Sequence, residues 1–468
     1  MKILFIVPLS STMAGLDYVP TFPHLGIASL AAMLKDKHEV RLLDMRIARS
    51  QGNLINVIRR YKPELVGVTA ASFQYKKLYR MVDKIKQEGD FKVVLGGPHV
   101  SIFKRRVLEE TSADLAVMGE GEYAMVDICS GKPYDLIDGL IYRKGGSVVE
   151  NKVRPPNEDL DRLPFSALEL FDMEAYADKK IPILTSRGCP YGCIYCSVSL
   201  TMGRGFRPRS PENVIDEILY WHKRGYRLFQ FQDDCFSFDM DRAKKICELI
   251  LEKGIEIRWD IRNGLSAGKV DRELLRLMKK AGCVFVAYGI ESVDEDVLRN
   301  MRKGSSLPQI KNAIRITREA GMDVGGFFVI GLPGDTAEKA SKCFDFAKKF
   351  NLKEYWFYNA IPYPGTRLYD WAQANARWLV SRHDYLEKAQ YFSFEPVYET
   401  AEFKKNDRIR VLRVLQGKAM NRIMRNEFGF LIGYMGYLIW KNPFLRYALM
   451  GLASRIWKYR RERRRGVA

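Results

Sequence analysis

Residues 185–196 read Thr-Ser-Arg-Gly-Cys-Pro-Tyr-Gly-Cys-Ile-Tyr-Cys, which places Cys189, Cys193 and Cys196 in the spacing C-x3-C-x2-C. Cysteine thiolates hold iron–sulfur clusters, and a cubane cluster contains four irons. Three thiolates leave one iron open to a small molecule, as a catalytic metal keeps one position free. A zinc site would need a fourth ligand at short spacing, and the next histidine, His222, falls in a helical pattern. The spacing therefore predicts a four-iron cluster, with three clustered buried cysteines as the simpler alternative.

The length and composition indicate a multidomain protein of a reducing compartment. A chain of 468 residues suggests two or three domains. The five other cysteines show no paired spacing, which argues against a disulfide framework and for the cytoplasm: Cys129, Cys235, Cys247, Cys283 and Cys343. The apolar start, residues 1–8, has no cleavage-site pattern and predicts a first strand instead of a signal peptide.

Residues 1–150 alternate short apolar strands with helix-length segments. The expected strands are Lys2–Pro8, Glu39–Leu43, Leu65–Ala70, Lys92–Leu95 and Leu115–Met118. Near-continuous apolar strands separated by helices indicate an α/β fold, a doubly wound, Rossmann-like parallel sheet covered on both faces. Such sheets bind ligands at the carboxyl ends of their strands. Glycine-bearing loops fall there, although tight turns that bind nothing would have the same composition: Gly96–His99 and Gly119–Glu122. No G-x-G-x-x-G follows the first strand, so a dinucleotide is not expected.

After a linker at residues 151–180, the alternation restarts and predicts a (βα)6 partial barrel over 181–366. The expected strands are Ile181–Ser186, Leu228–Gln232, Ile255–Arg262, Val284–Ile290, Val324–Gly331 and Tyr355–Ala360. Barrel enzymes place their chemistry on loops at the carboxyl ends of the strands. The three cysteines fall just past the first of these strands.

The cysteine motif, with Tyr195 before the last cysteine, resembles that of the radical S-adenosylmethionine (SAM) enzymes. The resemblance implies that Cys189, Cys193 and Cys196 hold a [4Fe-4S] cluster and that its open iron chelates SAM. It implies cleavage of SAM to methionine and a 5′-deoxyadenosyl radical, with an electron donor such as flavodoxin or ferredoxin. Tyr195 is expected to contribute to the SAM site.

Polar residues and glycines at the other strand ends suit the groups of SAM. Carboxylates suit its ammonium or ribose, arginine suits its carboxylate, and glycine admits the adenine to bare backbone. The stretch 289–292 is similar to the family's SAM-binding segment on the fourth strand, and 233–234 to its acidic segment on the second. The candidate SAM residues, each of which could instead be an ordinary strand-end residue, are Asp233, Asp234, Arg262, Glu291, Ser292 and Gly331. Cys235 is expected to be a buried apolar residue, with a hydrogen-donor role as the alternative.

The first domain is similar to the cobalamin-binding domain that precedes the barrel in one large radical SAM subfamily. The resemblance rests on residues 23–26, Asp44 and the two glycine loops. It implies cobalamin contacts from His24, Gly26, Thr69, Ser72, Gly97, His99, Gly119 and Glu120. The D-x-H-x-x-G motif that supplies a cobalt-binding histidine is absent, because Met45-Arg46 follow Asp44. A base-off cofactor without histidine ligation is therefore expected, and a loop residue beside the corrin is preferred to His99 as a cobalt ligand.

Residues 367–468 leave the barrel alternation and predict a helical, basic C-terminal region. Residues 401–468 contain 17 Lys and Arg against 4 Asp and Glu, and Phe428–Trp440 carries no charge. A spanning helix needs about 20 apolar residues, so neither apolar segment spans alone. Aromatic residues flanked by cations suit a helix in a membrane interface. A helical cap packed on the barrel would use the same apolar face and stays open.

Together these features predict a cobalamin-dependent radical SAM enzyme of unidentified catalytic residues. The expected reaction is C-methylation of an unactivated carbon of an amphiphilic lipid, isoprenoid or tetrapyrrole. Cyclisation, rearrangement or carbon–carbon joining is the alternative within the same chemistry. An iron–sulfur protein that binds nucleic acid is the alternative of another class, but the uncharged run does not fit a base-stacking groove, and no nucleic-acid partner is expected. The expected location is the cytoplasm, peripheral on the inner face of the membrane.

Overall fold

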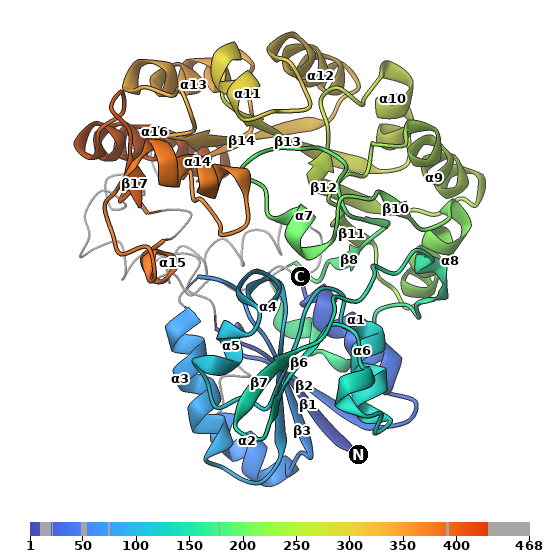
Figure 1. The fold of residues 1–468 in the computed structure, drawn as a ribbon. Helices are drawn as coiled ribbons and strands as arrows, with labels where there is room; N and C mark the ends of the chain where they lie inside the picture. The colour runs from blue at the N-terminus through green and yellow to red at the C-terminus, as the bar shows by residue number, and fades with distance from the viewer. Residues whose placement is uncertain are drawn as a thin grey trace.

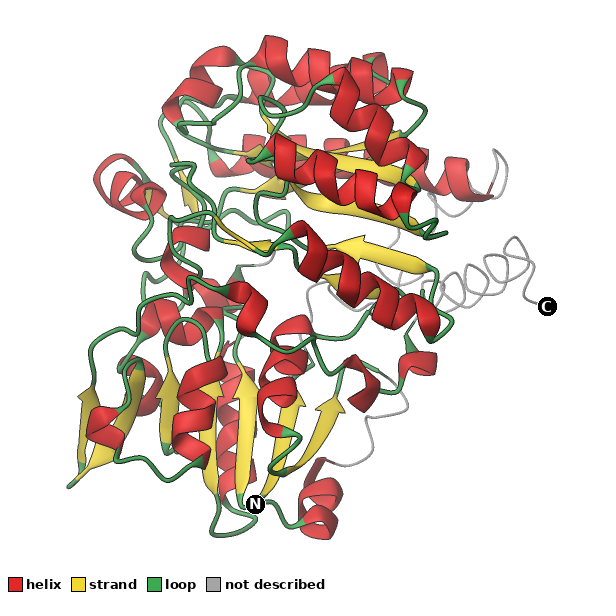
Figure 2. Ribbon diagram, turned by 90° about the vertical axis from the view of Figure 1, so that its right-hand side faces the viewer, coloured by secondary structure: helices red, strands yellow, loops and turns green. Residues whose placement is uncertain are grey.

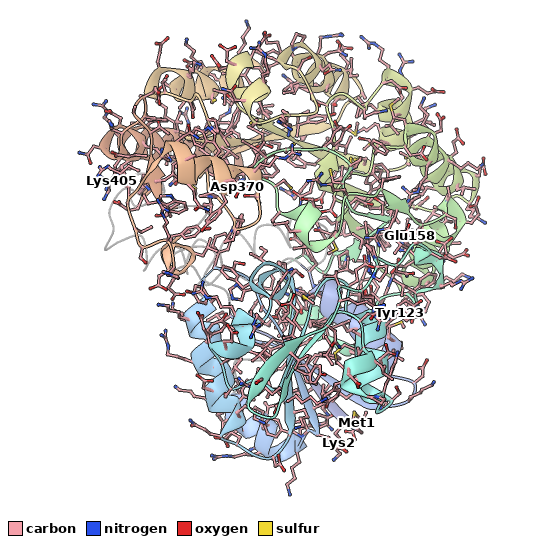
Figure 3. All side chains as sticks on the ribbon, viewed as in Figure 1. Met1, Lys2, Tyr123, Glu158, Asp370 and Lys405 are labelled. Atoms are coloured by element: carbon pink, nitrogen blue, oxygen red, sulfur yellow. The ribbon has the colours of Figure 1, made fainter. Side chains whose placement is uncertain are left out.

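The structure is a computed structural model that describes residues 1–9, 20, 22–47, 54–73, 75–176, 178–389 and 393–428. It confirms the predicted α/β class: a doubly wound sheet domain lies below a parallel barrel domain (Figure 1). Met1 and Lys2 lie at the end of the sheet domain far from the barrel, whereas Tyr123 and Glu158 lie near the boundary (Figure 3).

The first sheet has the strand order β2-β1-β3-β4-β5-β6-β7. Its parallel strands are β1 (Lys2–Val7), β2 (Glu39–Asp44), β3 (Leu65–Thr69), β4 (Lys92–Gly96) and β5 (Leu115–Val117). An antiparallel hairpin, β6 (Leu140–Lys144) and β7 (Ser147–Glu150), extends its edge and was not expected from the sequence. The order reverses between β1 and β3, which creates a crevice at their carboxyl ends. Those ends point toward the barrel domain (Figure 2).

Helices cover both faces of this sheet because its strands are buried on both sides. They are α1 (Leu25–Leu34), α2 (Leu54–Tyr61), α3 (Tyr75–Lys86), α4 (Pro98–Phe103), α5 (Arg106–Glu109) and α6 (Glu122–Cys129). Three short 3-10 helices follow in the linker: Leu160–Arg162, Leu168–Leu170 and Met173–Ala175. The linker is attached to the first domain, since the Tyr176 hydroxyl donates to Asp44 Oδ2 at 2.8 Å.

The barrel sheet is wholly parallel and has the order β15-β14-β13-β12-β11-β8. Its strands are β8 (Ile181–Ile183), β11 (Leu228–Phe231), β12 (Arg258–Leu265), β13 (Cys283–Glu291), β14 (Asp323–Ile330) and β15 (Glu354–Asn359). Two strands differ by three residues from the predicted limits. The first strand stops at Ile183, and β12 begins and ends three residues later than expected; its pairing with β13 shifts register before and after Ile261.

The barrel helices begin, with the exception of the first, at polar caps that the sequence provides. They are α7 (Val198–Thr201), α8 (Pro211–Lys223), α9 (Met240–Glu252), α10 (Arg272–Lys280), α11 (Glu295–Asn300), α12 (Leu307–Glu319), α13 (Ala337–Lys349) and α14 (Arg367–Asn375). Each of seven side chains accepts the backbone N–H three residues ahead, which satisfies an otherwise unpaired donor: Ser210, Asp239, Asp271, Asp294, Ser306, Thr336 and Thr366.

The C-terminal part of the described chain packs on the barrel. It contains β16 (Arg377–Trp378), α15 (Tyr385–Lys388), β17 (Tyr398–Glu399) and α16 (Lys405–Phe428). Helix α16 lies against β15 and α13, and Gln416 Nε2 donates to the Phe357 carbonyl at 2.9 Å. None of the helices in the described ranges is long and apolar enough to cross a membrane. The basic end and nearly all of the uncharged run 428–440 lie outside the described residues.

Candidate functional site

The cysteine segment leaves the barrel sheet through a short antiparallel ladder. Strand β9 (Ser186–Arg187) pairs with β10 (Arg207–Pro208). The next residue, Gly188, has φ +80°, and a Cβ there would lie 2.2 Å from the Gly205 carbonyl oxygen. Only glycine fits this close approach. The ladder therefore sets the direction in which the three cysteines leave β8.

Each cysteine sulfur faces a backbone N–H group. The donors are Tyr191 for Cys189, Gly304 for Cys193 and Val198 for Cys196. Backbone N–H groups directed at sulfur suit cluster-bound thiolates, whose charge they stabilise. All three thiols are half-buried, and burial raises the pKa of Cys196 to about 11. In the described ranges, no three His, Cys, Asp or Glu side chains are placed to hold a single metal ion. The donor set fits a multi-iron cluster.

Tyr195 and Glu291, two of the candidate SAM residues, meet beside this segment. The Tyr195 hydroxyl donates to Glu291 Oε1 at 2.8 Å, and Lys303 Nζ donates to the same oxygen at 3.0 Å. Burial and the Glu291 charge raise the pKa of Tyr195 well above its ordinary value. Burial alone would lower the pKa of Lys303, but the charge of Glu291, the hydrogen bond to it and the neighbouring Cys193 and Cys196 together outweigh burial, so the net pKa is raised. Lys303 was not predicted from the sequence.

The acidic pair after β11 divides between two roles. Asp233 is 1% exposed, and its Oδ1 accepts the hydroxyls of Thr185 at 2.7 Å and Ser186 at 2.5 Å. Asp233 therefore anchors the segment that leads to the cysteines. Asp234 is half-buried and accepts the Gly188 N–H at 3.2 Å, so it remains beside the cysteines.

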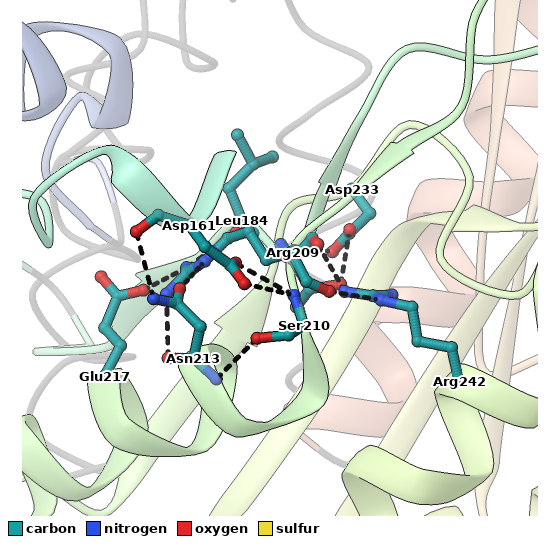
Figure 4. A network of polar contacts seen from close by, with 9 residues as sticks. Asp161, Leu184, Arg209, Ser210, Asn213, Glu217, Asp233 and Arg242 are labelled. Carbon is teal, nitrogen blue, oxygen red and sulfur yellow. Dashed lines mark hydrogen bonds and ion pairs between the residues drawn. The ribbon is translucent and has the colours of Figure 1, made fainter. Parts of the chain in front are cut away.

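A wider polar network supports this anchor (Figure 4). Arg242 donates to the Thr185 carbonyl at 2.5 Å and to the Arg209 carbonyl at 2.7 Å. Arg209 in turn donates to the Leu184 carbonyl at 3.0 Å and to Glu217. These contacts join α8 and α9 to the chain between β8 and the cysteines. The network is a structural support that the sequence patterns did not indicate.

Three other candidate SAM residues have partners within the protein. The Ser292 hydroxyl accepts the Asp294 N–H at 3.2 Å. Gly331 has φ +91°, and the Arg408 guanidinium occupies the space next to its Cα, 2.2 Å from where a Cβ would stand. The expectation that Arg262 ends its strand is wrong, because β12 continues to Leu265. Arg262 instead pairs with Glu354 at 2.6 Å, at the start of β15.

A cavity of about 460 Å³ lies at the carboxyl ends of the first sheet. Six of the eight residues predicted to bind cobalamin line it: His24, Gly26, Thr69, Gly97, Gly119 and Glu120. Barrel residues close its other side, among them Leu184, Arg187 and Gln232. A Cβ at Gly96 or Gly119 would meet nothing within 4 Å, so both glycines present bare backbone to open space. A large planar ring needs such a surface, and the cavity fits the corrin in this respect.

Ser72 and His99 do not line this cavity. His99 is fully buried, with Nε2 at 2.8 Å from the Tyr79 hydroxyl and Nδ1 at 3.2 Å from the Ser72 hydroxyl. Its ring stacks on Tyr75, and burial with the charge of Arg106 lowers the pKa of His99 to about 3. The first turn of α4 directs His99 into the core, so neither residue reaches the cavity wall.

His24 lines the cavity but uses one ring nitrogen internally. Its Nδ1 accepts the Ile27 N–H at 3.2 Å and caps α1. Burial and the Arg46 charge lower the pKa of His24 to about 4, so the ring is neutral near pH 7. The neutral tautomer that accepts at Nδ1 carries its proton on Nε2. In this state His24 offers no ring nitrogen to cobalt.

Four buried charges join the cavity loop to the cysteine segment, and we call them the interlock. Arg187 Nη2 lies 2.7 Å from Glu122 Oε1, and Arg207 Nη2 lies 2.8 Å from Glu120 Oε1. The four side chains are at most 10% exposed. Arg187 lies two residues before Cys189, so the interlock connects the two candidate cofactor sites directly. The Gly-Glu-Gly-Glu loop and Arg187 were visible in the sequence, but their pairing was not.

Cys235 is buried, as expected, but it also contacts the cysteine segment. A hydrogen bond from the Cys235 thiol lowers the pKa of Cys189 and raises that of Cys235. The position of Cys235 directly after Asp233 and Asp234 was the sequence feature that could have indicated its contact with Cys189.

Comparisons with known proteins agree with the two sites. Residues 183–347 match the radical SAM superfamily and residues 13–129 match the B12 binding domain. An uncharacterized methyltransferase of Pyrococcus horikoshii is 31% identical over 92% of this chain and 96% of its own. An anaerobic magnesium-protoporphyrin IX monomethyl ester cyclase of Rubrivivax gelatinosus is 27% identical over 96% of this chain and 81% of its own.

The radical SAM methyltransferase TsrM of Kitasatospora setae, solved with cobalamin and a [4Fe-4S] cluster, has the same fold. The TM-score is 0.72 at 18% identity, over 97% of this chain and 99% of that one. The predicted cofactors, a [4Fe-4S] cluster, SAM and cobalamin, are those of the two matched domains. The chain is an enzyme, and it belongs to the family of radical SAM enzymes that carry a B12 binding domain.

Proposed function

We propose that this protein transfers a methyl group to an unactivated carbon of an amphiphilic substrate. The observation that carries the proposal is the shared cavity, because the strand ends of both domains line it. A methyl donor held over Gly97 and Gly119 would face the barrel mouth beside the cysteine segment. The methyltransferase relative supports the same reaction.

We propose residues 1–150 and 181–366 as the limits of the two domains.

Cys189, Cys193 and Cys196 would hold the cluster, and Asp234, Tyr195 and Glu291, which lie beside the cysteine segment, would contact SAM. When bound, the reduced cluster with SAM supplies the radical that removes a hydrogen atom, and cobalamin supplies the methyl group. A low-potential protein such as flavodoxin or ferredoxin is the proposed electron donor.

The test uses the full-length protein, reconstituted without oxygen and loaded with cobalamin. It is incubated with a host extract, a low-potential reductant and SAM labelled with deuterium in its methyl group. Labelled methyl in one class of metabolite, together with formation of 5′-deoxyadenosine, is the expected result. The Cys193→Ala variant should give neither product. Formation of 5′-deoxyadenosine without any labelled methyl would contradict methyl transfer.

That contrary result would favour the second candidate, a cyclisation or carbon–carbon joining reaction. The similarity to a cyclase over 96% of this chain is the specific observation that supports it. The mass of the product separates the two candidates, because neither ring closure nor carbon–carbon joining adds the labelled methyl group of SAM.

We also propose that the C-terminal region holds the enzyme at the inner face of the cytoplasmic membrane, where an amphiphilic substrate is concentrated. The support is the uncharged, aromatic run 428–440 followed by the cationic end of the chain. Insertion of apolar side chains resists salt, whereas attraction to anionic headgroups is screened within about 8–10 Å at physiological salt.

Flotation with anionic liposomes checks this proposal. The full-length protein should float, should float less in high salt, and should sediment after truncation at Asn426. A truncated protein that floats equally well would contradict membrane contact through this region.

A further inference from the structure

Glu291 owes its position to an irregularity at the end of β13. The pairing of β13 with β14 shifts register between Gly289 and Glu291, and Glu291 has φ +63°. A bulge of this kind re-aims a side chain, and a left-handed non-glycine residue marks a conformation that its surroundings must hold. The carboxylate folds back over Gly289, where a Cβ would stand 2.4 Å from Glu291 Oε1. The strand end is therefore built to place this carboxylate.

The segment 301–304 forms the opposite wall of the cysteine loop. The Met301 carbonyl accepts the Ile194 N–H at 3.1 Å, and the Tyr191 ring covers Gly304, 2.4 Å from where a Cβ would stand. The Gly304 N–H faces the Cys193 sulfur. Lys303 lies between these contacts, with its side chain 16% exposed and its ammonium 3.0 Å from Glu291 Oε1.

The Lys303 ammonium is within electrostatic range of the thiols of Cys189, Cys193 and Cys196. Two neighbouring donors thus converge on the same region, the ammonium of Lys303 and the N–H of Gly304. The only anion paired with this ammonium in the described ranges is Glu291. Tyr195, which precedes the last cysteine, donates to that carboxylate and holds it in place.

We propose that Lys303 and Glu291 set the reduction potential of the cluster. Lys303 favours the reduced state by its positive charge, and Glu291 positions Lys303 and offsets part of that charge. The step concerned is the uptake of one electron by the oxidised cluster from a low-potential reductant, with no proton transferred and no bond broken. The added negative charge is stabilised by a nearby cation, and the effect is strong because a partly buried site screens charge weakly. The proposal rests on the proposed function only in requiring that the cluster binds.

The two residues predict shifts of opposite sign. Lys303→Met removes the cation, so the midpoint potential should become more negative than in the wild type. Glu291→Gln keeps the shape and removes the anion, so the potential should become less negative. Lys303→Arg retains the charge and should stay near the wild-type value. A merely structural role would not move the potential in two directions.

The experiment is a redox titration of the full-length, reconstituted protein without SAM, followed by the electron paramagnetic resonance signal of the reduced cluster. SAM is omitted so that a change in SAM binding cannot contribute. Lys339→Met is the matched control, because Lys339 forms a similar ion pair with Asp294 at 3.0 Å but has no contact with the cysteine segment among its described contacts. The midpoint potential of the cluster in Lys339→Met should equal that of the wild type.

Equal potentials in Lys303→Met and Lys303→Arg would overturn the proposal, as would shifts of the same sign in Lys303→Met and Glu291→Gln. If Lys303→Met does not retain iron, the isosteric Glu291→Gln variant decides alone, and an unchanged or more negative potential refutes the idea. A wild-type protein that binds no iron would instead refute the proposed function. The two failures are therefore distinct.

Discussion

The interlock between the two cofactor sites makes a quantitative prediction for Arg187→Met. Arg187 and Glu122 are 10% and 8% exposed, and removal of one partner from a buried ion pair costs about 3–5 kcal/mol. Ser29 still donates to Glu122 at 2.7 Å, and Arg207 still pairs with Glu120 at 2.8 Å. We therefore expect the lower end of that range, about 3 kcal/mol.

Hydrogen exchange suits the measurement, because a two-domain chain does not unfold in one step. The readout is the backbone amide of Met125, which donates to the Gly121 carbonyl at 2.9 Å in the first turn of α6. A loss of about 3 kcal/mol corresponds to roughly a hundredfold faster exchange. The double variant Arg187→Met/Glu122→Leu should exchange more slowly than Arg187→Met, because it leaves no unpaired carboxylate at position 122.

Arg105→Met is the control for this prediction. Arg105 and Glu109 form an ion pair on the surface, 58% and 44% exposed, and such pairs contribute less than about 1 kcal/mol. If Arg187→Met accelerates exchange no more than this control, the interlock does not form in solution. The free-energy losses of the single variants Arg187→Met and Glu122→Leu can also be added. A double variant whose loss equals that sum would refute the reasoning, because the two residues would then not interact.

Three further predictions concern the two sites. Cys193→Ala should abolish the cluster, which in the wild type should give about four irons and four sulfides by chemical analysis; zinc without iron in the wild type would contradict this. Gly97→Ala should weaken cobalamin retention on gel filtration, because position 97 has φ +95° and a Cβ there would stand 3.0 Å from Thr69 Oγ1. Gly205→Ala is the control and should retain cobalamin, because position 205 has no positive φ and a Cβ there would meet open space. Burial alone would raise the pKa of Glu122, but the Arg187 charge and the hydrogen bonds from Arg187 and Ser29 together outweigh it and lower the pKa below the ordinary 4.5. The resulting stability is present above pH 4.5 and should be lost as pH falls further, measured as a loss of α6 protection after correction for the intrinsic exchange rate at each pH; Glu122→Gln should remove this loss.

The architecture and the cluster motif could be predicted from the sequence alone. The parallel strands of both sheets and most of their helices were predictable, because apolar periodicity and polar caps act over a few residues, whereas the antiparallel β6–β7 hairpin was not. Cys189, Cys193 and Cys196 were predictable for the same reason, since their spacing is a local property. The glycine loops also indicated where a ligand would lie, because carboxyl ends of parallel strands share one edge of a sheet.

Which side chains face those sites depends on the tertiary structure. Arg262 lies inside β12 and pairs with Glu354, and His99 is buried in the core, where it stacks on Tyr75. Lys303 was brought to the cysteines by a loop more than a hundred residues away in the chain, and Arg187 met Glu122 across the domain boundary. Such contacts depend on how whole elements pack, and periodicity within one segment carries no information about its distant neighbours.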